Sequence, residues 1–353
     1  MIKVDLVTGF LGSGKTTFIK EYAKKLVESG ERLAIIVNDY GAINVDRLLL
    51  EETLGDMCHL EMVIGGDPDC TRRRLKTKLI AVGMDRYTRV IIEPSGIFDV
   101  DTFFDMIYEE PLERWYEIGS VITLVEAGID KDLTYNSDNI SDAAGIYLLA
   151  SQIAKAGVVV LSKMDEYLDS CITCEVNEGN NIPGKDFSTQ ADNNISNSPN
   201  RNRAREDYVN HMLNYINESL SLYKCTRKIK ELCIWDKDNL SQESFEHIKS
   251  AGYRSGEMVK LPVSDDNGFE SLFFFHLQVK LDGIEDRISN LFEDKTCGNV
   301  IRLKGFIEDE RGQWMEINAT RRNKSISPIS IGQDLFIVIG EGLNKDNIQK
   351  ILE

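Results

Sequence analysis

The stretch GFLGSGKT, residues 9–16, decides how the first part of this chain of 353 residues folds. It fits the pattern G-x-x-x-x-G-K-[ST], in which glycines let successive backbone N–H groups turn inward toward the oxygens of a phosphate chain. Lys15 supplies a positive charge near the β- and γ-phosphates, and the Thr16 hydroxyl is placed to bind Mg²⁺. The motif therefore predicts a nucleotide-binding loop with these contact residues: Gly12, Ser13, Gly14, Lys15, Thr16 and Thr17.

Apolar runs and helical patterns alternate on either side of this loop. The buried-strand candidates are residues 2–7, 33–37, 90–92, 121–125 and 158–161. They are apolar nearly throughout, as strands covered on both faces by helices are. We therefore predict an α/β fold, a doubly wound and mostly parallel sheet, over residues 1–252, followed by a smaller α+β domain over residues 253–353. Residues 175–205 are rich in Asn, Ser, Asp and Gly, which predicts a flexible surface insertion.

Composition excludes several classes of partner. Acidic residues outnumber Lys and Arg 58 to 41, so the net charge is −17, and we expect neither nucleic acid nor an anionic membrane as a partner.

No apolar run approaches the roughly 18 residues of a membrane span. The first strand-like run begins at once, so we expect no signal peptide. The seven cysteines do not form a disulfide framework, which favours a cytoplasmic protein with reduced thiols.

Polar residues follow the predicted strands, at the edge of the sheet where doubly wound folds bind ligands. Asp39 follows the second strand and Glu93 the third, and either carboxylate is a candidate to hold Mg²⁺ with Thr16 or to orient the attacking water. Ser95 and Gly96 give a loop able to approach the γ-phosphate and change shape when it leaves. We therefore predict Lys15, Asp39 and Glu93 as catalytic residues. Because these loops carry no evident catalytic Arg or Gln, we expect slow intrinsic hydrolysis.

The stretch SKMD, residues 162–165, follows the last strand of this half and suits guanine recognition. The carboxylate of Asp165 can pair with the donors on the guanine edge while the stem of Lys163 covers the base. This pair favours GTP over ATP. The usual guanine-reading motif begins with Asn, and the shorter Ser162 cannot copy its amide.

Together these motifs resemble the CobW-like metallochaperones, a group of P-loop GTPases related to UreG and HypB. The resemblance rests on GFLGSGKTT (9–17), NDYGAINVD (38–46), EPSG (93–96), SKMD (162–165), and two strand-like runs in the second half, NVIRLKGFI (299–307) and FIVIG (336–340). It implies GTP hydrolysis with Mg²⁺, coupled to the delivery of a transition metal such as Zn²⁺ or Co²⁺ to a client metalloprotein. Neither the client nor the oligomeric state follows from the sequence.

One departure from the family pattern concerns the metal. Where the family carries Cys-x-Cys-Cys, this chain has GDPDCT, residues 66–71, so carboxylates replace two thiolates. The resemblance then implies a transition-metal site built from Asp67, Asp69 and Cys70, with Cys58 or His59 as a further ligand. Such a site is weaker for Zn²⁺, because thiolates suit Zn²⁺ and carboxylates suit harder ions.

Three functions stay open at this point. The first is a GTP-driven metallochaperone or metallocofactor insertase. The second is a GTPase that regulates a metalloenzyme without carrying metal, which the altered motif permits. The third is a small-molecule kinase in which residues 72–74, three consecutive arginines, act as a lid. Cys171 and Cys174 are either a metal-collecting arm or ordinary thiols, since one C-x-x-C pair lacks the ligands of a structural zinc site.

Overall fold

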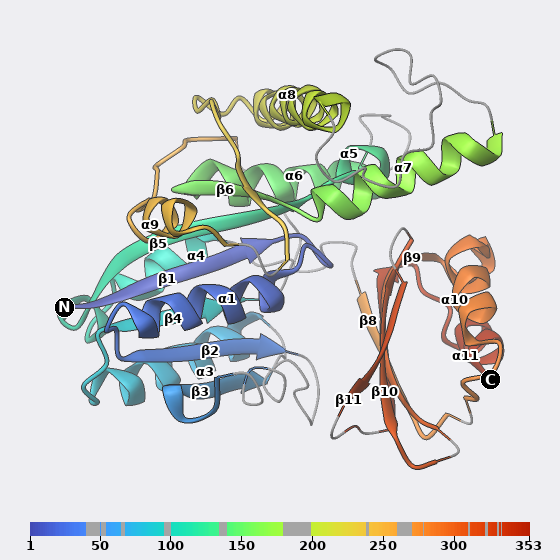
Figure 1. The fold of residues 1–353 in the computed structure, drawn as a ribbon. Helices are drawn as coiled ribbons and strands as arrows, with labels where there is room; N and C mark the ends of the chain where they lie inside the picture. The colour runs from blue at the N-terminus through green and yellow to red at the C-terminus, as the bar shows by residue number, and fades with distance from the viewer. Residues whose placement is uncertain are drawn as a thin grey trace.

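The computed structural model describes residues 1–39, 50, 54–64, 68–94, 100–133, 140–178, 199–237, 240–259, 270–277, 279–309, 311–321, 324–329, 332 and 334–353. Two β-sheets organise these residues, as Figure 1 shows. None of the described helices is long and apolar enough to cross a membrane.

The first sheet has seven strands in the order β3-β2-β4-β1-β5-β6-β7, and every neighbouring pair is parallel. Their bounds are β1 Ile2–Gly9, β2 Leu33–Asp39, β3 Cys58–Ile64, β4 Arg89–Glu93, β5 Tyr116–Glu126, β6 Val158–Ser162 and β7 Cys233–Trp235. The strands β4 and β6 are buried along their whole length, because helices cover both faces of the sheet. The doubly wound parallel fold predicted from the sequence is confirmed.

Helices cover the two faces in separate clusters. On one face, Phe18 and Tyr22 of α1 and Phe245 of α9 pack against alternate residues of the strands. On the other face lie α3, α4 and α6, and α8 packs over α6. The bounds are α1 Lys15–Glu28, α3 Pro68–Gly83, α4 Val100–Ile107, α5 Ile129–Asp132, α6 Ile140–Lys155, α7 Met164–Glu178, α8 Pro199–Leu222 and α9 Gln242–Lys249, with 3₁₀ turns at Gly55–Met57 and Leu112–Arg114.

Two elements differ from the sequence expectation. Strand β3 was not predicted, because its polar residues, such as His59 and Glu61, interrupt the apolar run, as an edge strand permits. Helices also occupy both ends of the expected flexible insertion: α7 runs to Glu178 and α8 begins at Pro199. The residues between them lie outside the described ranges. Ion pairs from α8 to α7, presented below, account for the order at the start of α8.

The second sheet is antiparallel, with its five strands in the order β11-β10-β9-β12-β8. Helices α10 and α11 cover the face that points away from the first sheet (Figure 1). The bounds are β8 Glu270–Phe275, α10 Ile284–Glu293, β9 Asn299–Glu308, β10 Trp314–Thr320, β11 Lys324–Ile329, β12 Leu335–Glu341 and α11 Lys345–Leu352, with a 3₁₀ turn at Lys295–Cys297. The predicted boundary at residues 252/253 stays a prediction.

The second sheet touches the loop between β1 and α1. Ile301 of β9 and Ile339 of β12 pack against the cluster that contains Phe10 and Leu11. A Cβ atom added to Gly12 would lie 3.0 Å from the Cγ2 of Thr320, at the end of β10. The second sheet therefore lies directly on the phosphate loop.

A buried ion pair ties the central strands together. Asp5 of β1 accepts hydrogen bonds at 2.7 Å from Arg89 of β4 and from the backbone N–H of Ser120 in β5, and one at 2.8 Å from the hydroxyl of Tyr22. Burial and the charge of Asp5 raise the pKa of Tyr22. Burial opposes the charged form of Arg89, but Asp5 more than compensates, so the pKa of Arg89 is raised. The pair holds β1, which leads into the phosphate loop, between its neighbours.

We predict that Arg89→Met lowers the free energy of unfolding by about 3–5 kcal/mol, because it leaves the Asp5 carboxylate buried without its counter-ion. Urea denaturation measures the change. The matched control is Arg86→Met, which removes an exposed arginine three residues earlier and should shift stability by less than about 0.5 kcal/mol. A loss below about 1 kcal/mol in Arg89→Met would contradict the prediction.

Candidate nucleotide-binding site

The phosphate loop has a backbone that few residues other than glycine adopt. Gly9, Gly12 and Gly14 have φ angles of 147°, 83° and 87°. A Cβ at Gly9 would lie 2.5 Å from the carbonyl oxygen of Leu124, so a side chain there would push the loop off β5. The bend is therefore specified by the glycines of the motif, as the sequence predicts.

Lys15 begins α1 and folds back over this loop. Its Nζ donates to the carbonyl oxygens of Gly9, at 2.9 Å, and Phe10, at 3.2 Å. The residue is buried, at 7% exposure, and the first turn of α1 contains no acidic side chain. The hydroxyl of Ser13 is buried and has no hydrogen-bond partner among the described residues. A buried ammonium, an unbonded hydroxyl and a helix N-terminus at one bend are suited to an anion with several oxygens.

Thr16 and Glu93, two of the predicted Mg²⁺ ligands, meet beside the loop. The Thr16 hydroxyl donates to Oε1 of Glu93 at 2.9 Å, and Glu93 is buried at the end of β4. Two ligands on one edge of an Mg²⁺ octahedron, with bonds of about 2.1 Å, lie about 3.0 Å apart. The separation of these two oxygens is that of an ordinary hydrogen bond, and it is also compatible with both oxygens binding one Mg²⁺.

The other residues predicted to hold Mg²⁺ or to approach the γ-phosphate are only partly described. Asp39 ends β2, where its backbone pairs with Ile64 of β3, but its side chain lies outside the described part of the structure. Ser95 and Gly96 also lie outside the described residues. Their predicted roles stay predictions.

Ser162 ties the SKMD stretch, which is predicted to recognise guanine, to the phosphate loop. Its hydroxyl donates to the Ser13 carbonyl oxygen at 2.8 Å, and the residue is fully buried. The sequence suggested that Ser162 is too short to copy the amide of the usual Asn, yet the hydroxyl still reaches the loop. Lys163 has a φ of 58°, and its Nζ lies 2.9 Å from Oε1 of Glu126, at the end of β5.

Asp165 lies in the first turn of α7 and is paired with two arginines of α8. Its Oδ1 accepts hydrogen bonds from Arg205 and from Arg201, the latter at 3.2 Å. The second nitrogen of Arg205 bonds Asp236, just after β7, at 2.9 Å, and the second nitrogen of Arg201 bonds Asp169 at 2.7 Å. Burial alone would raise the pKa of Asp165, but the two arginines lower it, so the carboxylate stays ionised.

Sequence reasoning missed the two arginines and Asp236. Asp236 comes directly after β7, and Glu93 is the last residue of β4, so the strand-end signal that identified Glu93 could also have found Asp236. No sequence pattern indicates that the two arginines contact Asp165, because they lie 36 and 40 residues from it, in the segment predicted to be a flexible insertion.

The stretch predicted to bind a transition metal follows β3. Asp69 and Cys70 are in the first turn of α3, but their side chains, and the whole of Asp67, lie outside the described residues. Cys58 and His59 begin β3, so the length of a seven-residue strand, about 20 Å, separates them from its end. Burial raises the pKa of Cys58 to about 11, and His59 is bonded to Glu61 at 3.0 Å. The expectation that Cys58 or His59 assists this site is therefore wrong.

The remaining candidates from the sequence lie on α3 and α7. Arg72 pairs with Glu109, which also bonds Lys76 at 2.7 Å, so Arg72 is held by a surface carboxylate. Cys171 and Cys174 lie one turn apart within α7. No group of three or more His, Cys, Asp or Glu side chains arranged to hold a metal ion occurs in the part of the chain that the structure describes.

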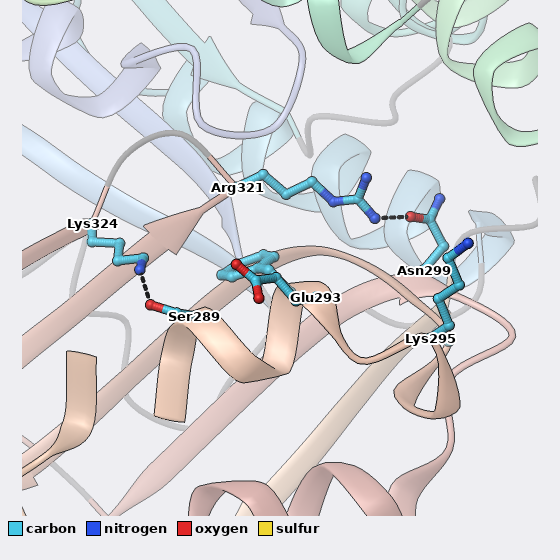
Figure 2. A pocket seen from close by; sticks show the side chains of 8 residues that line it. Ser289, Glu293, Lys295, Asn299, Arg321 and Lys324 are labelled. Carbon is cyan, nitrogen blue, oxygen red and sulfur yellow. Dashed lines mark hydrogen bonds between the residues drawn. The ribbon is translucent and has the colours of Figure 1, made fainter. Parts of the chain in front are cut away.

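A cavity of about 740 Å³ opens between α10, the start of β9, the end of β10 and the start of β11 (Figure 2). It contains none of the predicted site residues. Its lining residues are Ser289, Phe292, Glu293, Lys295, Gly298, Asn299, Arg321 and Lys324. Two hydrogen bonds span it, from Arg321 to Asn299 at 2.5 Å and from Lys324 to Ser289, as the dashed lines in Figure 2 show.

Comparison with known protein families decides the assignment. The family described as "CobW/HypB/UreG, nucleotide-binding domain" matches residues 3–180, about half of the chain. The chain belongs to the CobW/HypB/UreG family. This match includes the phosphate loop, Glu93, the altered cysteine stretch and Asp165, so the resemblance inferred from the motifs is confirmed.

Relatives within the CobW/HypB/UreG family are named for zinc. The chain is 30% identical to the zinc chaperone YjiA of Escherichia coli over 46% of this chain and 50% of the relative. It is 26% identical to zinc-regulated GTPase metalloprotein activator 1 of Schizosaccharomyces pombe over 46% of this chain and 39% of the relative. The matched part thus spans about half or less of these relatives. Among solved structures, Zn(II)-bound YjiA GTPase from E. coli aligns over 100% of this chain and 99% of that one, at 16% identity and a TM-score of 0.32.

We predict that Ser162→Ala lowers the free energy of unfolding by about 1–3 kcal/mol, because the buried carbonyl of Ser13 loses its donor. Urea denaturation measures the loss. Ser221→Ala is the matched control, since it removes an exposed hydroxyl that bonds a carbonyl within α8, and it should change stability by less than about 0.5 kcal/mol. Equal effects of the two substitutions would show that the Ser162 bond does not hold the phosphate loop.

Proposed function

We propose that this protein binds and hydrolyses GTP, with slow intrinsic turnover, and uses the nucleotide to control delivery of a transition metal to a client metalloprotein. The phosphate loop carries this proposal, because its bend, Lys15 and the Thr16–Glu93 pair form one site at the carboxyl ends of β1 and β4. The relatives are named zinc chaperone and zinc-regulated GTPase metalloprotein activator, and these names support a transition metal as the cargo. We place the activity in the cytoplasm, which suits the free cysteines of the described residues.

Each part of the nucleotide has a candidate partner. The loop N–H groups and Lys15 would bind the β- and γ-phosphates, and Thr16, Glu93 and Asp39 would hold Mg²⁺. The Mg²⁺ would neutralise charge on the phosphates during hydrolysis. Ser95 and Gly96 would contact the γ-phosphate. Ser162, Lys163 and Asp165 would form the base subsite.

The proposed metal stretch lies along the same sheet edge as the nucleotide. In the strand order β3-β2-β4-β1, the helix with Asp69 and Cys70 follows β3, and the phosphate loop follows β1. Three strand spacings separate the ends of these strands, roughly 14 Å. The strand β2, which ends at Asp39, lies between β3 and β4. A change in the nucleotide would have only this short distance to cross to the end of β3. The stretch after that strand contains Asp67, Asp69 and Cys70, which we propose as ligands of the cargo metal.

The second sheet offers a route from the nucleotide to a client. Ile301 and Ile339 pack against the cluster containing Leu11, and Thr320 lies against Gly12. Because packed side chains shift together when a loop changes conformation, occupancy of the phosphate loop would alter the position of the second sheet. We propose that the client is recognised in this nucleotide-dependent arrangement.

The altered cysteine stretch favours a second candidate, a GTPase that activates a metalloenzyme without carrying metal. Two of the expected thiolates are carboxylates in this chain, and carboxylates hold Zn²⁺ less well. Metal stoichiometry separates the two candidates.

We predict that Lys15→Ala weakens GTP binding by about a hundredfold or more, because the β- and γ-phosphates lose their buried counter-charge. Isothermal titration with GTP and Mg²⁺ measures the affinity. Lys24→Ala is the control, since it removes an exposed lysine of the same helix and should leave GTP affinity within about twofold. Undiminished binding by Lys15→Ala would reject the nucleotide site.

We also predict that the metal-stripped protein binds about one equivalent of Zn²⁺ or Co²⁺ with an affinity that GTP changes by about five- to 150-fold, the usual range of coupling between two sites. Competition titrations against a chelator, with saturating GTP or with none, measure this change. Cys70→Ser should lose most of the metal affinity, whereas Cys225→Ser, a thiol of the α8–β7 connection, should retain it.

The result discriminates between the candidates. Metal binding that is indifferent to GTP would contradict the chaperone. If the parent protein binds one equivalent of metal and Cys70→Ser loses it, the second candidate, a GTPase that carries no metal, is rejected.

A further inference from the structure

Two arginines of α8 engage the carboxylate that is proposed to read guanine. Arg201 and Arg205 lie one helical turn apart, and both donate to Oδ1 of Asp165. Each arginine has a second anchor: Arg201 bonds Asp169 of α7 at 2.7 Å, and Arg205 bonds Asp236, which follows β7, at 2.9 Å. We call Arg201 and Arg205 the α8 clamp.

The anchors hold the clamp in place without a ligand. The side chain of Arg201 is 13% exposed, and that of Asp236 is 17% exposed. Asp236 also accepts the backbone N–H of Asp165 at 3.2 Å, which fixes the start of α7 relative to the end of β7. An arginine that bonds two carboxylates through different nitrogens has little conformational freedom in its side chain. The clamp is therefore already formed before a nucleotide binds.

Guanine needs the same carboxylate. Its edge carries two adjacent donors, N1–H and the 2-amino group, which a carboxylate accepts with one oxygen each. A carboxylate oxygen has two lone-pair positions. On Asp165, both positions of Oδ1 are filled by the clamp, and all hydrogen bonds to this side chain from the described residues end on Oδ1. A guanine that pairs with both oxygens must therefore displace at least one arginine.

We propose that Arg201 and Arg205 determine nucleotide affinity and specificity by competing with guanine for Asp165, so that the base binds only when the α8 clamp opens. This proposal rests on the proposed binding of GTP. The clamp lowers affinity for guanine in particular, because adenine has an acceptor at N1 and gains nothing from a released carboxylate. GTP binding thereby shifts the start of α8.

The test compares nucleotide affinities of single arginine variants. Arg205→Ala and Arg201→Ala are each titrated with GTP and with ATP in the presence of Mg²⁺. We expect GTP to bind about tenfold more tightly to Arg205→Ala than to the parent, since one charge-assisted bond no longer competes, and ATP affinity to stay within about twofold. The effect of Arg201→Ala should have the same sign and be smaller, because its bond to Asp165 is longer.

The chain supplies a matched control. Arg203 lies between the two clamp residues on α8 and is exposed, and its side chain makes no hydrogen bond or ion pair with the other described residues. Arg203→Ala removes the same charge from the same turn, so it should leave both affinities unchanged. If an alanine variant fails to fold, Arg205→Lys keeps the charge but cannot bridge two carboxylates as arginine does, and it should tighten GTP binding by about threefold.

A separate variant distinguishes failure of the clamp from failure of the base assignment. Asp165→Asn should lose GTP affinity and gain affinity for xanthosine triphosphate, because xanthine carries an oxygen where guanine has the 2-amino group and the Asn amide can donate to it. If GTP affinity is unchanged in Asp165→Asn, this residue does not read the base and the clamp proposal fails with it. Undiminished GTP binding by Lys15→Ala would instead reject the proposed nucleotide site itself.

The sign of the change decides the proposal. Weaker GTP binding by Arg205→Ala and Arg201→Ala would show that the arginines orient Asp165 for guanine, and unchanged binding would show that they have no role at the base. Equal tightening of GTP and ATP, or an equal effect of Arg203→Ala, would show a general effect of charge. Each of these results overturns the clamp.

Discussion

The phosphate loop can exist in its observed bend only because distant parts of the chain support it. Its glycines allow the positive φ angles, but the carbonyl of Leu124 sets how close Gly9 lies to β5, and the Ser162 hydroxyl fixes the Ser13 carbonyl. On the outer side, Ile301 and Ile339 of the second sheet pack against the cluster of Leu11. A loop held from several directions moves little by itself, so a ligand that does move it also moves its supports.

The order of the parallel strands explains why residues so far apart in sequence form one site. All seven strands of the first sheet end at the same edge, and β1 lies between β4 and β5. This arrangement places Thr16 against Glu93, although 77 residues separate them, and puts Glu126 beside Gly12. The buried pair of Asp5 and Arg89 joins β1 to β4 and fixes their alignment. The site is thus a product of strand order.

Electrostatics at the base subsite differs from that at the phosphates. The phosphate loop presents a lysine and backbone N–H groups within a strongly anionic chain, whose net charge is −17. The base subsite instead contains carboxylates, and two arginines already occupy one of them. In the same structure, therefore, the phosphate end is prepared for an anion while the base end is closed by an internal ion-pair network. Under the proposed binding of GTP, the balance between the two ends would set how readily a nucleotide enters.

The sequence alone determined the phosphate loop, the parallel doubly wound sheet and the identity of Thr16, Glu93 and Asp165 as candidate site residues. These follow from local patterns: glycine spacing, continuous apolar runs and polar residues at strand ends. Only the tertiary structure decided the pairing of Asp165 with Arg201 and Arg205, the bond from Ser162 to Ser13, the separation of Cys58 from the end of β3, and the contact of the second sheet with Gly12. Each depends on residues that the chain brings together by packing, and sequence spacing contains no measure of such distances.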